Sequence, residues 1–535
     1  MNYSYEINNE LSNDKINFII SIVIDDIIDM IKGNNSQFLD HRYFYERRKL
    51  KVETETILPT TYCNFCHGIN NKYINFNPKY MSIDYLLNDN LNLNNEKFID
   101  REIKYKTGGF RSLSSDETKV ILDKELGKFG TNVKIEEAIG NPFSDNNIIH
   151  CFNSFIEQTY NSNNRFLFRK NYGAEKGITR QQSYFSAGFE LLEHAGLEYS
   201  GNIPIISAKY KDVRDYSIDL SKIINSIRNK NTEFDEFDED AEIDWVVSKS
   251  LITNKNILVP AFLVFMYDVE LKGMFFPITS SGAAIGITLE DATLHALLEA
   301  VERDSWLICQ SNPYIMPIIN YDTITNTKLK EIIYKIKEKG YDIVTRDYTT
   351  DLGIPTYRTW ILNKNDYLRY AYNGLGCHVY GELALERSIT EAVQVDDWSD
   401  TGGEIDSDMI TLKVLDESLT NIYNQHYLVN KDIFGKTNKI NDVKNLFEDV
   451  TSSYQCIKKL SKLISEKVNG DVLYVDMTKH GMDVKIVRTI ITGDFQQMNI
   501  PLISASDRMF NFGINCGYSN RKTKYEELFM GKYAH

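Results

Sequence analysis

An internal repeat constrains this chain more than any other feature of its sequence. Residues 176–194 recur 109 positions later as residues 285–303. A glycine, a threonine, an alanine and two glutamates keep the same offsets in both copies. Five matches at one fixed shift indicate a duplicated structural unit.

The same local structure is predicted for each copy. A glycine-bearing turn leads to Thr179 in the first copy and to Thr288 in the second. A threonine hydroxyl at this place can accept hydrogen bonds from the free amides of a helix's first turn. The apolar residues that follow have the spacing of one helix face. Each copy therefore predicts a turn followed by an amphipathic helix.

Two glutamates three residues apart lie on each predicted helix, Glu190 and Glu193 on the first, Glu299 and Glu302 on the second. Residues at this spacing share a helix face. An isolated pair would predict an exposed face with salt bridges. Beside an apolar stripe, however, carboxylates are costly to desolvate unless a cation neutralises them. Since Mg²⁺ prefers few carboxylates together with water and phosphate oxygens, the four acids predict two or three Mg²⁺ ions on a nucleoside triphosphate.

A turn of small residues, 279–286, precedes the second helix. Small side chains let backbone amides approach a phosphate group. The turn lacks the lysine of a Walker A loop, and Lys176 at the equivalent turn of the first copy would supply that cation. The candidate nucleotide-binding residues here are Lys176, Ser280, Ser281, Gly282, Ala284 and Gly286.

A third helix is predicted over residues 384–394. Arg387 and Glu391 are four residues apart and Gln394 follows three later, so all three share one face. One interpretation is a salt bridge along the helix. The other is that Arg387 contacts phosphate while Glu391 joins the metal ligands. His295, one turn before Glu299, is interpreted as an ordinary helix-face histidine rather than as part of the nucleotide site.

Composition narrows the class of protein. The chain has 535 residues and a formal net charge of −15, which argues against general binding to nucleic acid or to anionic membranes. The apolar run 16–31 contains three aspartates and is too short to span a membrane. Seven scattered cysteines are typical of a reducing compartment, so we expect a cytoplasmic protein. Strand-like runs alternate with helical patterns from about residue 100, which predicts a mixed α/β fold.

These segments, in this order, resemble the YcaO family of ATP-dependent cyclodehydratases. The match is strongest over Ser280–Asp304, which has the form S-x-G-x-A-x-G-x-T followed by E-x-x-E-R-D. Weaker matches are residues 176–193, 387–394, 108–112 and 476–478.

The resemblance implies a YcaO-type fold of repeated strand-turn-helix units over residues 101–535. It implies ATP bound through Mg²⁺ at Glu190, Glu193, Glu299 and Glu302. Lys176, Arg303 and Arg387 would then lie around the phosphates. In azoline-forming members, a Cys, Ser or Thr side chain of a ribosomal precursor peptide attacks the preceding amide, and phosphorylation of the amide oxygen allows ring closure.

Residues 1–100 look like the end of the E1-like partner domain that is often fused to YcaO enzymes. Cys63 and Cys66 form one CxxC pair, which is half of a tetrahedral zinc site. Zinc held by this pair, completion of the site by a partner chain, and a metal-free remnant are the alternatives. The shortness of this segment predicts a separate E1-like protein that binds the leader peptide. A flavin dehydrogenase and a second copy of the chain are further expected partners.

Two alternatives to azoline formation stay open. The chain ends at His535 without the proline-rich tail that azoline-forming members commonly carry. Members that form thioamides or amidines commonly lack this tail too, so such a product is the first alternative. The other alternative is a non-catalytic subunit that binds the peptide. Four clustered carboxylates argue against such a scaffold, and nucleotide binding would separate the two.

Overall fold

The computed structural model describes most of the chain from residue 96 onward and short pieces before it. The described residues are 41–46, 51–56, 73–75, 77–79, 82–83, 87, 96–106, 108–128, 133–138, 143–144, 147–162, 165–197, 199, 203–223, 238–266, 271–273, 279–364, 371–394, 431–433, 435–479, 481–496 and 505–528. Cys63 and Cys66 lie outside these residues, so the structure says nothing about the zinc hypothesis. Strand β2 (Lys51–Thr56) pairs antiparallel with β1 (His41–Glu46).

The largest sheet has seven strands in the order β12-β19-β18-β10-β9-β3, with β11 also paired to β10. Its pairs are antiparallel except for β3 with β9. The strands are β3 (Tyr73–Asn75), β9 (Ile205–Lys209), β10 (Glu242–Ser250), β11 (Asn256–Pro260), β12 (Ala283–Gly286), β18 (Val472–Asp476) and β19 (Lys485–Ile491). The long helix α8 (Leu289–Ser311) packs on β12 and β19, and α13 (Ser453–Val468) packs beside α8.

A five-stranded sheet has the order β16-β15-β14-β13-β17. Its strands are β13 (Ile318–Asn320), β14 (Tyr341–Asp347), β15 (Thr356–Asn363), β16 (Ala371–Cys377) and β17 (Ile440–Asp442). Helices α9 (Thr327–Glu338) and α10 (Gly381–Val393) pack on it and share one apolar core with it. Gly376 allows α10 to approach β16 closely, since a Cβ there would lie 2.1 Å from the backbone oxygen of Ala384.

A three-stranded antiparallel sheet joins β6 (Val133–Glu137), β7 (His150–Ser162) and β8 (Arg165–Gly177). Helix α5 (Arg180–Gly196) packs on β7 and β8, and α4 (Ser115–Gly127) packs beside α5. The remaining elements are β4 (Tyr105–Lys106), β5 (Phe110–Arg111), α6 (Tyr210–Val213), α7 (Leu220–Ile223), α14 (Asp507–Asn515) and the 3₁₀ turns η3 (Arg214–Tyr216), η4 (Ala261–Leu263), η5 (Tyr321–Thr323) and η7 (Tyr525–Glu527). The mixed α/β prediction is confirmed.

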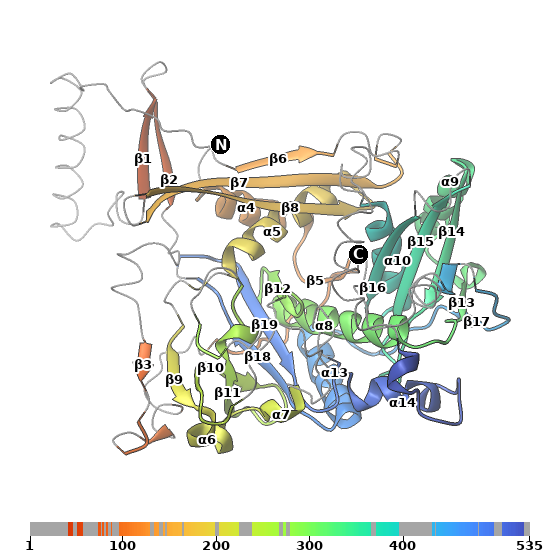
Figure 1. The fold of residues 1–535 in the computed structure, drawn as a ribbon. Helices are drawn as coiled ribbons and strands as arrows, with labels where there is room; N and C mark the ends of the chain where they lie inside the picture. The colour runs from red at the N-terminus through yellow and green to blue at the C-terminus, as the bar shows by residue number, and fades with distance from the viewer. Residues whose placement is uncertain are drawn as a thin grey trace.

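The duplicated unit is visible as β8 followed by α5 and as β12 followed by α8 (Figure 1). Both predicted helix caps are confirmed. The hydroxyl of Thr179 accepts a hydrogen bond from the backbone N–H of Gln182, and that of Thr288 accepts one from Asp291, each at 3.1 Å. α5 lies under the three-stranded sheet, α8 crosses the middle of the molecule and α10 lies beside the five-stranded sheet (Figure 1). Within the described part of the chain, no helix has both the length and the apolar character needed to cross a lipid bilayer.

Candidate active site

A cavity of about 800 Å³ lies between α5, α8 and α10. The end of β8, the turn before α8 and residues 108–113 complete its wall. Its volume is within the range of sites that enclose small molecules and cofactors. Eight acidic side chains and four basic ones line it: Glu175, Glu190, Glu193, Asp291, Glu299, Glu302, Glu386 and Glu391, with Arg111, Lys176, Arg303 and Arg387.

The four glutamates of the repeat all line this cavity. Enclosure away from water raises the pKa of each of them, and the pKa of Glu299 rises to about 7. The carboxylate of Glu175 adds to this effect at Glu190, and that of Glu299 adds to it at Glu193. Without a cation between them, these carboxyl groups therefore resist ionising together.

The arrangement fits magnesium bound together with phosphate. One carboxylate oxygen of Glu190 is buried without a hydrogen-bond partner, which leaves it free to bind a cation. No three His, Cys, Asp or Glu side chains among the described residues converge closely enough to hold a metal ion by themselves. Mg²⁺ tolerates such an open set because it takes its other ligands from water and phosphate oxygens.

Basic side chains lie among these carboxylates. The Lys176 Nζ lies 3.7 Å from Glu391 and 3.5 Å from Glu175. Burial alone would lower the pKa of Lys176, but the two carboxylates outweigh it and raise this pKa. On α8, an Nη atom of Arg303 lies 3.7 Å from Glu302 and forms no hydrogen bond. Buried cations with unused donors are suited to phosphate oxygens.

The family model for YcaO cyclodehydratases, described as ATP- and Mg²⁺-binding, matches residues 175–493. This chain belongs to the YcaO family. The match begins at the end of β8 and runs through α5, α8 and α10, so it contains both glutamate pairs.

Relatives of known sequence are distant. A protein of Methanothermobacter thermautotrophicus is 24% identical over 327 residues, which cover 60% of this chain and 80% of the relative. A protein of Rhizobium leguminosarum bv. trifolii is 30% identical over 161 residues, or 28% of this chain and 38% of the relative. Neither relative's name states a function.

Solved YcaO-type structures share the fold at low sequence identity. A heterocyclase in complex with substrate and cofactor gives a TM-score of 0.68 at 17% identity, over 98% of this chain and 69% of the other. The heterocyclase TruD gives 0.61 at 15%, over 97% and 64%. YcaO from Methanopyrus kandleri, bound with AMPPCP and Mg²⁺, gives 0.51 at 20%, over 73% and 94%.

The third predicted helix is α10, which contributes Arg387 and Glu391 to the cavity wall, and Gln394 joins them from the position directly after the helix. Glu391 faces Lys176, as described above, and the side-chain amide of Gln394 donates to the backbone oxygen of Ala174. The Nη2 of Arg387 lies 3.1 Å from the Nε2 of His295, and the Nε of Arg387 is buried without a hydrogen bond. The helix therefore brings all three predicted residues to the same cavity.

The expectation that His295 is an ordinary helix-face residue is wrong. Its ring lines the cavity, and its Nε2 is hydrogen-bonded to Arg387. Burial, with the nearby cations Arg387, Lys176 and Arg111, holds the pKa of His295 well below its usual value. A neutral ring beside a guanidinium accepts the hydrogen bond at Nε2 and carries its own proton on Nδ1. His295 thereby orients Arg387.

The turn of small residues before α8 only partly faces the YcaO cavity. Ser280 and Gly286 line it, whereas Ser281, Gly282 and Ala284 are not among the described residues of its wall. Gly282 has a φ of +80° and its carbonyl accepts from the backbone N–H of Thr489. A Cβ at Gly286 would lie 2.4 Å from the backbone nitrogen of Ala292. Close packing of β12 against α8 accounts for Gly286, whereas the positive φ of Gly282 and its close approach to Thr489 of β19 account for Gly282.

Sequence reasoning left several cavity residues unassigned: Arg111, Glu175, Asp291, His378 and Glu386. Burial lowers the pKa of Arg111, while the nearby carboxylates of Asp291 and Glu386 oppose that shift. Glu175, the neighbour of Lys176, could have been suspected from its place at the start of the first copy. Arg111 lies in the weaker family match 108–112, although no role was predicted for it. The sequence pattern assigned no role to Asp291, His378 or Glu386.

Proposed function

We propose that this chain is an ATP- and Mg²⁺-dependent cyclodehydratase that converts Cys, Ser or Thr residues of a ribosomal precursor peptide into azolines. Membership of the YcaO family supports an ATP-dependent enzyme. The observation that carries the proposal is the convergence of two glutamate pairs and three basic side chains on one cavity. This charge pattern suits a triphosphate held through divalent cations.

Each group of residues has a role in this proposal. Glu190, Glu193, Glu299 and Glu302 hold Mg²⁺, while Lys176, Arg303 and Arg387 hold the phosphates. MgATP, when bound, supplies a phosphoryl group to the amide oxygen, which can then leave as phosphate. The basic residues neutralise charge on the transferred group, and enclosure in the cavity keeps water away from it. His295 keeps Arg387 in one orientation by accepting its hydrogen bond.

The overall reaction balances as follows. The sulfur of a substrate thiol, or the oxygen of a substrate hydroxyl, forms a bond to the carbonyl carbon of the preceding amide. The carbonyl oxygen leaves with the phosphoryl group. The nucleophile loses its proton and the amide nitrogen loses its own, leaving a C=N bond in the ring. Peptide and ATP thus yield azoline, ADP and phosphate. Members that form thioamides or amidines would use the same activation with an external sulfur or nitrogen nucleophile.

The proposal extends to organisation and partners. Residues 101–535 form the catalytic domain, and residues 1–100 dock an E1-like protein that presents the leader of the precursor peptide. The heterocyclase in complex with substrate and cofactor shares its fold with 98% of this chain, so the same fold holds a substrate and a cofactor in that protein. A homodimer and a flavin dehydrogenase that oxidises the products complete the proposed assembly.

Calorimetric titration of AMPPCP in the presence of Mg²⁺ tests the nucleotide site. Wild-type protein should bind the analogue only with Mg²⁺ present. The double variant Glu299→Gln/Glu302→Gln should weaken binding by about 100-fold or more, because two of the four carboxylates lose their charge. Absence of binding to wild-type protein, also with candidate partner proteins added, would leave the peptide-binding scaffold as the better interpretation.

A matched control removes the same charge elsewhere. Glu331 and Glu338 lie exposed on α9. Glu331→Gln/Glu338→Gln should therefore leave affinity for the analogue within about twofold of wild type. Mass spectrometry of a precursor peptide after turnover separates the products, since azoline formation removes one water and thioamide formation exchanges oxygen for sulfur.

A further inference from the structure

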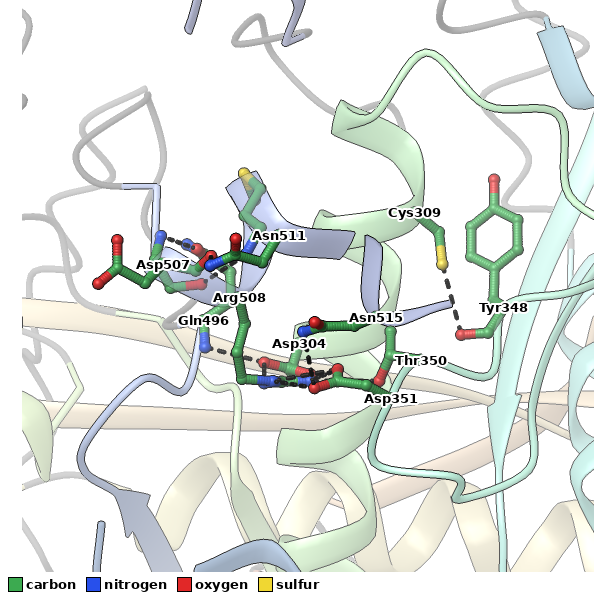
Figure 2. Close-up of polar contacts among 12 residues, drawn as sticks. Asp304, Cys309, Tyr348, Thr350, Asp351, Gln496, Asp507, Arg508, Asn511 and Asn515 are labelled. Atoms are coloured by element: carbon green, nitrogen blue, oxygen red, sulfur yellow. Dashed lines mark hydrogen bonds and ion pairs between the residues drawn. The ribbon is translucent and has the colours of Figure 1, made fainter. Parts of the chain in front are cut away.

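A buried ion cluster joins α8 to the C-terminal helix α14 on the side away from the cavity. Arg508 donates from Nη1 and Nη2 to the two carboxylate oxygens of Asp304, at 2.7 and 3.1 Å. It also donates from Nε and Nη2 to Asp351, at 3.2 and 2.8 Å. Figure 2 shows the Arg508 side chain extending from α14 to the two carboxylates. The side chain of Asp304 is 0% exposed and that of Arg508 5%.

Helix geometry relates this cluster to the cavity. Asp304 directly follows Arg303 and lies two residues after Glu302 on α8. Successive side chains on a helix point about 100° apart. Glu299, Glu302 and Arg303 line the cavity, whereas Asp304 is not among the described residues of its wall. Arg508 therefore holds α8 from behind, at the turn that carries Glu302 and Arg303.

Two other contacts hold the C-terminal half of α8 and the residue that follows it. The backbone N–H of Gln496 donates to Asp304 at 2.8 Å, which ties the chain after β19 to the helix. About two turns further on, directly after the end of α8, the side chain of Asn312 donates to the backbone oxygen of Met509 at 3.0 Å. The segment 505–528 thus holds α8 at two places.

We propose that Arg508 is a positioning residue for the cavity, acting through Asp304 to fix the rotation of α8 that points Glu302 and Arg303 at the nucleotide. The proposal rests on the nucleotide site proposed above. A guanidinium that binds both oxygens of one carboxylate fixes direction as well as distance, which a lysine ammonium does not. Precise rotation matters because a misplacement of about 1 Å can cost about 100-fold in rate.

A purely structural role makes a different prediction. Asp304 and Asp351 both pair with Arg508, but only Asp304 lies on α8. Asp304→Asn and Asp351→Asn are matched changes, because each leaves Arg508 with one charged partner and keeps the shape of the side chain. General stabilisation would make the two variants alike. Positioning of α8 would separate them.

The test combines hydrogen–deuterium exchange with calorimetry on the full chain. In the absence of nucleotide, Asp304→Asn and Arg508→Lys should speed amide exchange over residues 299–306, and Asp351→Asn should not. The first two variants should weaken binding of AMPPCP with Mg²⁺ by about tenfold or more, and Asp351→Asn by less than about twofold. Melting temperatures show how far each variant destabilises the whole fold.

Equal exchange and equal binding in Asp304→Asn and Asp351→Asn would overturn the proposal and make Arg508 a fold-stabilising residue. If wild-type protein fails to bind AMPPCP, the proposed function fails. The exchange experiment still decides whether Arg508 positions α8, because it needs no nucleotide.

Discussion

The two copies of the repeated unit place the same glutamate pair among different neighbours. On α8, Arg303 follows the pair and lies 3.7 Å from Glu302 and 4.0 Å from Glu299. On α5, His194 occupies the corresponding position. The first pair instead finds a partner in the other copy, since Glu193 accepts a hydrogen bond from the backbone N–H of Ile285 at 3.0 Å.

This difference affects the charge of the two pairs. Enclosure raises the pKa of Glu190 and Glu193 well above the usual value, and Glu175 and Glu299 add repulsion. Enclosure also raises the pKa of Glu299, but Arg303 opposes the rise and the pKa is about 7. Duplication has kept the spacing of the carboxylates, while neighbouring residues have made the second pair easier to ionise.

The largest effect on nucleotide affinity is expected when the residues that follow the two glutamate pairs, His194 and Arg303, are exchanged. Arg303→His removes a cation beside Glu299 and Glu302 and should weaken binding of AMPPCP with Mg²⁺ by about tenfold to 100-fold. His194→Arg adds a cation beside the first pair and should change affinity by less than about threefold. Calorimetry on both variants checks this. Equal losses would show that the two copies contact the phosphates alike.

The pH dependence of binding sharpens the comparison further. The groups that set the pKa of Glu299 near 7, besides its enclosure, are Arg303, Glu302, Arg488 and Arg387. Because Mg²⁺ binds the ionised carboxylate, affinity should fall by about tenfold per pH unit below 7 for each proton released. Calorimetry between pH 6 and 8, in buffers of different ionisation heat, counts those protons. Affinity that does not change over this range would contradict a raised pKa at Glu299.

The same shift has an opposite consequence for stability. A carboxyl group whose pKa is higher in the folded state than its ordinary 4.5 contributes stability at low pH, and that contribution is lost as pH rises through about 7. Without metal at pH 8, Glu→Gln variants should therefore melt higher than wild type, by about 1–3 °C. Both Glu193→Gln and Glu299→Gln should show this gain, since enclosure raises the pKa of both carboxyl groups. Calorimetric melting of both variants checks this effect, which is the smallest of those expected. A melting temperature below that of wild type would contradict it.

Local periodicity explains what could be predicted from the sequence. The caps at Thr179 and Thr288 and the shared faces of the glutamate pairs follow from helix geometry, and the structure has them where they were expected. The role of the turn before α8 was harder to predict from the sequence, because small residues suit both phosphate binding and close packing. Gly286 packs closely against Ala292 and also lines the cavity, so it combines both features, and its role in nucleotide binding stays a prediction.

Contacts between distant segments could not be predicted. His295 and Arg387 are 92 residues apart and lie on different helices, α8 and α10. Asp304 and Arg508 are separated by 204 residues. Neither pair has a spacing that indicates contact, because only the tertiary fold brings α8 close to α10 and to α14.

Among the described residues, the hydrogen bond from the backbone N–H of Ile285 to Glu193 has no counterpart from the first copy to the second. At the equivalent place in the first copy, the backbone N–H of Lys176 donates to its neighbour Glu175. The copies have therefore become complementary parts with a fixed order along the chain. In a chimera with residues 175–194 in place of residues 284–303, a lysine would replace Ile285 beside a glutamate that competes for its amide, and the carboxylate of Glu193 would lose its orientation. We therefore expect this chain to tolerate exchange of both copies together more readily than exchange of either one alone.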